Sequence, residues 1–261
     1  MPSVRIASPL SPDGESVLHY SDTGGPGQPL LVLHGGWGAC YYPFDAQVAA
    51  LAADVRCVIP DRTGYGRSTP VTSFPPRFHD AAAIEAEHFL DALGIDRCAI
   101  WGHSDGAVIA TVMALRQPAR YRALVLEALH VECAKPSSRA FFTMMIEDPD
   151  GFGDRVTARL AADHGERWRV PIRADGQVWL DLAAAGAELY DHRLAELRVP
   201  TLLVHGGADP RTEPGELDRF GHAVPGATIH VIAGAGHSPH SERAAAAETT
   251  EVATAFLRAN R

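Results

Sequence analysis

Features that define several specialised protein classes are scarce or missing in this chain of 261 residues. It has only four cysteines, widely spaced and without a C-x-x-C pair, so the sequence supports neither a zinc ribbon nor a disulfide framework. No apolar run approaches the roughly 18 residues that a membrane-spanning helix needs, and the first residues lack the basic end and apolar stretch of a secretion signal. We therefore expect a cytoplasmic protein with reduced thiols and no membrane partner.

The chain has fewer positively charged than negatively charged residues. The chain carries 23 Lys and Arg against 32 Asp and Glu, a formal net charge of −9, and has no long basic cluster. A nucleic-acid partner would need a basic surface to neutralise phosphates, so we expect none. The residues are 46% apolar and 21% charged, which is typical of a globular protein with a sizeable core.

Short apolar runs alternate with longer segments of helical periodicity. This alternation predicts an α/β fold, with a mostly parallel twisted sheet and helices on both of its faces. A hairpin over residues 3–21, turning at Pro12-Asp13-Gly14, is expected at the sheet edge. The predicted strands span residues 30–35, 55–60, 98–102, 123–128, 201–205 and 228–232, and the predicted helices span residues 43–53, 80–94, 105–117 and 240–258.

One long segment breaks the alternation. Residues 131–198 contain no convincing strand. They contain several helical patterns, which are separated by turn-forming sequences such as Asp-Pro-Asp-Gly. We expect residues 1–130 and 199–261 to form the core domain and residues 131–198 to form a helical lid, the name used below for that segment. No sequence feature indicates the oligomeric state.

The strongest chemical signal is the sequence Gly102-His103-Ser104-Asp105-Gly106, a G-x-S-x-G pattern between a predicted strand and a predicted helix. Small residues on both sides allow a sharp turn that exposes the serine hydroxyl at a helix N-terminus. The alternative is an ordinary turn with a serine N-cap, but the flanking strand and helix favour a nucleophile. We therefore predict that Ser104 is a catalytic nucleophile.

A serine nucleophile needs a base within hydrogen-bonding reach. His237 follows the last predicted strand, in Gly234-Ala235-Gly236-His237, where the loop would direct its ring toward the same edge of the sheet as Ser104. His240 is the competing candidate, although we expect it to begin the last helix. The sequence thus favours His237 as the base.

The base in turn needs a carboxylate that orients it. Asp209 follows the strand predicted at 201–205, and the resulting order of serine, aspartate and histidine is one of the arrangements known for such triads. Glu127 and Glu132, near the end of the preceding strand, are the alternatives. We predict that Asp209 fills this role.

An oxyanion hole requires backbone N–H groups directed at the developing negative charge. One donor should be the N–H of Asp105, the residue after the nucleophile. The second should come from the turn His34-Gly35-Gly36-Trp37, with Gly36 favoured and Trp37 as the alternative. We expect His34 itself to hold this loop by hydrogen bonds rather than to transfer protons.

These motifs resemble those of the α/β-hydrolase superfamily over nearly the whole chain. Residues 61–68 resemble the D-x-x-G-x-G-x-S loop of its capped members, and the lid stands where their cap domain stands. The S-D-G elbow is similar to that of biphenyl-hydrolase-like and valacyclovir-hydrolase-like esterases, which implies Asp105 as a possible substrate-contacting acid. Because Ser104 replaces the nucleophilic aspartate of the family's dehalogenases and epoxide hydrolases, the resemblance argues against their chemistry.

We therefore expect a serine hydrolase that cleaves a small ester, lactone or related acyl compound through an acyl-enzyme on Ser104. Hydrolysis of a C–C bond in a β-diketone-like substrate, and a cyclase-like or ligand-binding protein that keeps the fold, stay as alternatives. No H-E-x-x-H motif or ligand-spaced histidine cluster is present, so we expect no metal and no cofactor. Activity should rise with pH near the usual imidazole range of about 6 to 7.

The substrate itself is left open, and only its contacts can be suggested. The Asp105 carboxylate should favour neutral or cationic substrates if it faces the pocket, whereas a helix-capping role would remove that preference. Large apolar residues of the lid could line the pocket, or could equally form the lid's own core. The expected substrate contacts are Asp105, Trp37, Phe141, Met145 and Trp168, and further lid residues considered are Phe142, Met144 and Trp179.

Overall fold

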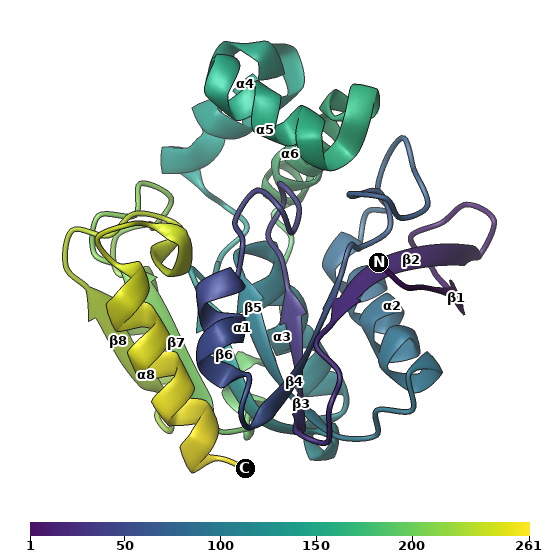
Figure 1. Ribbon diagram of the computed structural model, residues 1–261. Coiled ribbons are helices and arrows are strands. Elements are labelled where there is room, and N and C mark those ends of the chain that lie inside the picture. Colours follow the sequence, from purple (N-terminus) through teal and green to yellow (C-terminus); the bar gives the residue numbers. More distant parts are fainter.

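A single eight-stranded sheet forms the centre of the protein. The structure is a computed structural model that describes all 261 residues, and Figure 1 shows the sheet with helices around it and three further helices above one edge. The strands are β1 Ser3–Ala7, β2 Glu15–Asp22, β3 Gln28–Leu33, β4 Val55–Pro60, β5 Cys98–His103, β6 Tyr121–Glu127, β7 Thr201–Gly206 and β8 Thr228–Ile232.

The strand order in space is β1-β2-β4-β3-β5-β6-β7-β8. Strands β3 to β8 are parallel to their neighbours, whereas β2 is antiparallel to both β1 and β4. The prediction of a mostly parallel sheet with an N-terminal hairpin is therefore confirmed. Gly14 has a φ of 74° in the hairpin turn, which a glycine adopts without strain.

Helices cover both faces of this sheet, as predicted. Along β3, Leu30 and Val32 point to one face, where they join the core that α1 and α8 cover, while Leu31 and Leu33 point to the other, where α2 and α3 pack. Burial on both faces explains why the central strands are continuous apolar runs. These helices and the short α7 are α1 Asp45–Leu51, α2 Phe78–Ala92, α3 Asp105–Arg116, α7 Glu216–Ala223 and α8 Ala246–Ala259.

The last helix begins later than the sequence predicted. Residues 239–241 form a short 3₁₀ helix, η6 Pro239–Ser241, and α8 starts only at Ala246. The carboxylate of Glu242 accepts hydrogen bonds from the backbone N–H groups of Gly236 and Ser238, at 2.8 and 3.0 Å, so this segment folds back onto the preceding loop. The prediction that His240 begins the last helix is therefore wrong, and α7 was not predicted at all.

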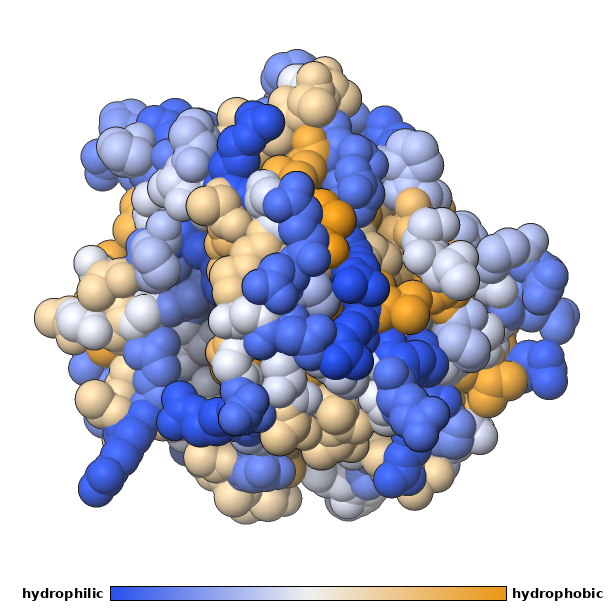
Figure 2. Space-filling model, turned by 90° about the horizontal axis from the view of Figure 1, so that it is seen from above, coloured by the Kyte–Doolittle hydropathy of each residue, from blue (hydrophilic) through white to orange (hydrophobic).

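The segment between β6 and β7 is helical and contains no strand. Its helices are α4 Arg139–Glu147, α5 Asp154–His164 and α6 Arg169–Ala184. They lie above the carboxyl ends of the central strands (Figure 1), and their outer surface is mostly hydrophilic with scattered hydrophobic patches (Figure 2). The division of the chain at residues 131 and 198 stays a prediction. No helix of the protein is both long and apolar enough to cross a membrane.

Candidate active site

Ser104 lies on a strained turn between β5 and α3. Its φ is 55° and its ψ is −118°, a conformation that a residue with a side chain rarely adopts, and its backbone N–H donates to the Glu127 carbonyl at 2.9 Å. The flanking glycines permit this turn. A Cβ atom at Gly102 would collide with the carbonyl of Gly106, and one at Gly106 would collide with the carbonyl of Leu33. These clashes explain why the G-x-S-x-G pattern has glycine at both positions.

Three side chains from distant parts of the chain meet at this turn. Asp209 follows β7 and His237 follows β8, so both lie at the carboxyl ends of parallel strands, as does Ser104. The Nε2 atom of His237 lies 3.0 Å from Ser104 Oγ, and its Nδ1 atom lies 2.8 Å from Asp209 Oδ2. This is the hydrogen-bonded order that a serine nucleophile, a base and an orienting acid require.

The Asp209 carboxylate is held in its ionised form. Burial alone would raise its pKa, but the hydrogen bond from His237 and the backbone N–H of Arg211, which donates to Asp209 Oδ1 at 2.9 Å, lower the pKa below its usual value. His205 lies on its other side, with Nε2 3.5 Å from Oδ2. A permanent negative charge therefore faces Nδ1 of His237.

His237 is held in its neutral form. Burial disfavours the charged ring, and the positive charge of Arg211 acts in the same direction, so the pKa of His237 falls to about 4 in spite of the opposing Asp209 carboxylate. The ring of His130 stacks on it with a centroid distance of 5.5 Å, and burial lowers the pKa of that ring as well. A neutral His237 can accept a proton on Nε2.

The pKa of His237 changes the expected pH dependence. Because His237 must be neutral to accept a proton, kcat/KM should rise with pH through the pKa of this ring and then level off. We expect the midpoint of the rise near pH 4, below the range of about 6 to 7 that an unperturbed imidazole would give. A pH profile of kcat/KM on a neutral ester measures it, and a midpoint above pH 6 would contradict this electrostatic picture.

A second pair of carboxylate and imidazole lies directly behind the first. Glu127 Oε1 accepts hydrogen bonds from the backbone N–H of His240 at 3.0 Å and from its Nδ1 at 2.7 Å, and Trp101 Nε1 donates to Oε2 at 3.1 Å. Both side chains of the pair are fully buried. Neither the His240 nor the Glu127 side chain forms a hydrogen bond with Ser104 Oγ, whose partner is His237. The other alternative acid, Glu132, pairs with Arg219 instead.

The same pair forms part of a histidine cluster that the sequence did not predict. His103, Glu127 and His240 each place one potential ligand atom within 4.8 Å of the others. Their segments are far apart in the chain, so no ligand spacing in the sequence could reveal the group. Because protein donors already occupy both oxygens of Glu127, the arrangement is that of a buried hydrogen-bond network.

Backbone donors border the serine from two sides. Gly36, Trp37 and Asp105 all line the cavity above Ser104. Asp105 is the first residue of α3, where an N–H has no partner within the helix, and neither Gly36 nor Trp37 donates a backbone hydrogen bond within the protein. His34 holds this loop, as expected: its Nδ1 lies 2.7 Å from the Gly35 carbonyl.

Asp105 lies in the cavity wall, but protein groups surround its carboxylate. Oδ1 lies 3.0 Å from Trp179 Nε1 and 3.2 Å from His79 Nε2, and the Arg62 guanidinium is 4.0 Å from Oδ2. Asp175 of α6 lies beside it, and burial together with the neighbouring Asp105 charge raises the pKa of Asp175 well above its usual value.

The cavity above Ser104 is small. Its volume is about 20 Å³, whereas that of a neighbouring apolar cavity between α4 and α6 is about 300 Å³. Phe142 and Trp179, stacked with a centroid distance of 5.5 Å, line both cavities and form the wall between them. A substrate larger than a few atoms therefore needs these side chains or the lid to move.

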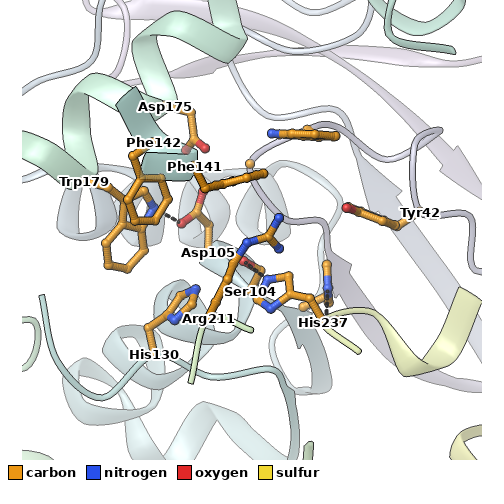
Figure 3. Close-up of a pocket in the computed structure, with 13 residues that line it drawn as sticks. Tyr42, Ser104, Asp105, His130, Phe141, Phe142, Asp175, Trp179, Arg211 and His237 are labelled. Atoms are coloured by element: carbon orange, nitrogen blue, oxygen red, sulfur yellow. Dashed lines mark hydrogen bonds between the residues drawn. The ribbon is translucent and has the colours of Figure 1, made fainter. Parts of the chain in front are cut away.

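The predicted substrate contacts divide into two groups. Trp37, Asp105 and Phe141 line the cavity, as do Phe142 and Trp179 (Figure 3). Met145 and Trp168 do not: both are buried in the apolar core, where Met145 packs against Gly176 of α6, and their role as substrate contacts stays a prediction. The pattern of apolar residues on a helix could not show which of them face the core.

Several residues that line the cavity were not predicted from the sequence. Arg211 had a weak signal, since it follows Asp209 by two residues on the same loop. Asp175 lies within a lid helix, and only the docking of that helix brings it to Asp105. The missed lining residues are Tyr42, His103, His130, Asp175 and Arg211.

Comparison with known proteins agrees with this geometry. The sequence pattern of the alpha/beta hydrolase family matches residues 30–249, most of the chain. The chain belongs to this family. The family match and the mostly parallel eight-stranded sheet confirm the predicted α/β-hydrolase fold.

Relatives within the family differ in the reactions for which they are named. The chain is 26% identical over 230 residues to the mouse (Mus musculus) protein serine hydrolase BPHL, covering 85% of this chain and 77% of that protein. It is 27% identical over 262 residues to a 2-hydroxy-6-oxononadienedioate/2-hydroxy-6-oxononatrienedioate hydrolase of Paraburkholderia phymatum, covering 87% and 86%. A thermophilic esterase of Thermogutta terrifontis superposes with a TM-score of 0.77 at 22% identity, over 99% and 98% of the two chains.

Proposed function

We propose that this protein is a serine hydrolase that cleaves a small ester, lactone or related acyl compound. The observation that carries the proposal is the continuous hydrogen-bonded array from Asp209 through His237 to Ser104, with distances of 2.8 and 3.0 Å. Such an array at a strained turn has no evident structural purpose, since the fold needs no hydroxyl at Ser104. Its relatives named serine hydrolase and esterase lend support.

The proposed reaction proceeds through an acyl-enzyme. His237 Nε2 removes the proton of Ser104 as Oγ attacks the substrate carbonyl, and Asp209 holds the ring in the required tautomer. The N–H of Asp105 and that of Gly36 or Trp37 stabilise the negative charge on the carbonyl oxygen. His237 then gives its proton to the leaving group, and a water molecule, activated by the same ring, releases the acid and restores Ser104.

A second candidate reaction is hydrolysis of a C–C bond in a β-diketone-like substrate. The observation that favours it is the similarity to the hydrolase of Paraburkholderia phymatum, whose name describes a dioate substrate. The same three residues serve this reaction. A substrate panel separates the two candidates: p-nitrophenyl esters of increasing acyl length, lactones, and a β-diketone, compared by kcat/KM on one preparation of enzyme.

Covalent labelling tests the nucleophile directly. We expect an alkyl fluorophosphonate to form one P–O bond with Ser104 Oγ as fluoride leaves, because the neutral His237 activates that hydroxyl. Peptide mass spectrometry should place a single adduct on Ser104, and the Ser104→Ala variant, with an unchanged circular dichroism spectrum, should remain unlabelled. Absence of labelling in the folded wild-type protein would contradict the proposed function and favour a ligand-binding role.

A further inference from the structure

Arg211 is anchored at the cavity by its backbone. It lies on the loop after β7, two residues beyond Asp209, and its N–H donates to the Asp209 carboxylate at 2.9 Å. Its carbonyl accepts a hydrogen bond from the buried ammonium of Lys135 at 3.2 Å. These two hydrogen bonds hold the backbone of Arg211 in place. Its side chain lines the cavity above Ser104 (Figure 3).

The guanidinium of Arg211 has no anionic partner in the protein. It lies over the ring of Phe141, 3.9 Å from the centroid, near the hydroxyl of Tyr42. It forms no ion pair, since no carboxylate oxygen comes within 4.0 Å of it. A half-buried guanidinium with unused donors is well suited to bind a carboxylate, because its planar fork matches the two carboxylate oxygens.

The other charged or titratable groups of the cavity are already compensated. The Asp105 carboxylate contacts His79 and Trp179, lies 4.0 Å from the Arg62 guanidinium, and is only 1% exposed. Burial and the neighbouring Asp105 charge raise the pKa of Asp175 well above its usual value, which favours its neutral form. Burial lowers the pKa of His130 well below its usual value, so that ring is neutral at pH 7. The one uncompensated charge that faces the cavity is therefore positive, although the whole protein carries a formal net charge of −9.

We propose that Arg211 binds a carboxylate of the substrate and gives the enzyme a preference for anionic acyl compounds. The inference rests on the proposed function and adds a substrate class to it. It differs from the preference for neutral or cationic substrates that the sequence allowed if Asp105 faced the pocket. The aromatic stack with Phe141 leaves the edge of the guanidinium, where its N–H groups lie, available to such a ligand.

Matched esters test this preference. We would compare 4-nitrophenyl hydrogen glutarate with 4-nitrophenyl pentanoate, and 3-acetoxybenzoate with phenyl acetate, because these pairs place the carboxylate on the acyl side and on the leaving-group side. In Arg211→Gln, the ratio of kcat/KM for the anionic over the neutral ester should fall about tenfold or more in at least one pair, and Arg211→Lys should fall between it and wild type. Arg155→Gln, which removes an exposed arginine of α5 outside the cavity, is the control for net charge.

A purely structural role for Arg211 predicts a different result. If Arg211 only supports Phe141, both members of each pair should lose activity alike. Ratios within threefold of wild type in both pairs would overturn the proposal. An aminoacyl ester that is preferred over its neutral analogue in the wild-type enzyme would overturn it as well, and would support Asp105 as a cation contact.

A binding measurement separates this proposal from the proposed function. Calorimetric titration of glutarate into Ser104→Ala should show affinity at least tenfold higher than titration into the double variant that also carries Arg211→Gln. If fluorophosphonate labelling fails but this difference is found, the hydrolase function is wrong and the anion site stands. If labelling succeeds but glutarate binds both variants equally, the anion site is wrong and the hydrolase function stands.

Discussion

Replacement of Ser104 with alanine should abolish hydrolysis while the fold is retained. We expect kcat/KM to fall by about 10⁴-fold or more, because His237 and Asp209 have no function in catalysis without the hydroxyl that they activate. A fall of this size corresponds to about 5.4 kcal/mol of lost transition-state stabilisation. Activity is measured on the ester that the substrate panel shows to be best, and circular dichroism reports on the fold.

Histidine variants provide the controls for this experiment. His237→Ala should lower kcat/KM almost as far as Ser104→Ala does. His240→Ala and His103→Ala should lower it much less per folded molecule, since neither ring touches Ser104. If Ser104→Ala retains a tenth of the wild-type rate, Ser104 is not the nucleophile. If His240→Ala loses more activity than His237→Ala, His237 is not the base.

Replacement of Asp209 with asparagine should be nearly as damaging. An asparagine amide would donate a hydrogen bond to His237 Nδ1, which forces the ring proton onto Nε2, the atom that must accept the proton of Ser104. We expect kcat to fall by about 10⁴-fold, the size of effect known for the same exchange in serine proteases. The loss should appear with little change in the thermal unfolding midpoint, because the asparagine side chain has nearly the same shape.

Glu127→Gln is the matched comparison for Asp209→Asn. It changes another buried carboxylate that contacts an imidazole, and it disturbs the bonds to His240 and Trp101. We expect it to lower the thermal unfolding midpoint and to leave a kcat per folded molecule that is at least 100-fold above that of Asp209→Asn. The opposite order would make Glu127 the orienting acid.

Local patterns predicted most elements of the fold. The apolar runs of the central strands are visible in the sequence because both faces of a parallel sheet are buried, and the predicted span of β4, residues 55–60, matches the structure. The start of α8 was missed because Glu242 folds the chain back through hydrogen bonds with Gly236 and Ser238. Such hydrogen bonds between a side chain and the backbone produce no periodic pattern in the sequence.

The candidate triad was visible for a topological reason. Parallel strands end at the same edge of the sheet, so residues that directly follow β5, β7 and β8 meet there whatever their separation in the chain. The pKa of His237 was not visible, because the lowering comes from its burial and from Arg211. The prediction that activity rises at about pH 6 to 7 took neither contribution into account.

The amino-acid sequence alone determined the class of fold, the strained turn around Ser104 and the order of the residues that face it. These features depend on neighbours in the chain or on the direction of parallel strands. Only the tertiary structure decided the charge of the cavity, because the fold places Asp175 of α6 beside Asp105 and leaves Arg211, which also lines the cavity, without an ion-pair partner. Electrostatic pairing depends on distances across the fold, and no spacing along the chain encodes those distances.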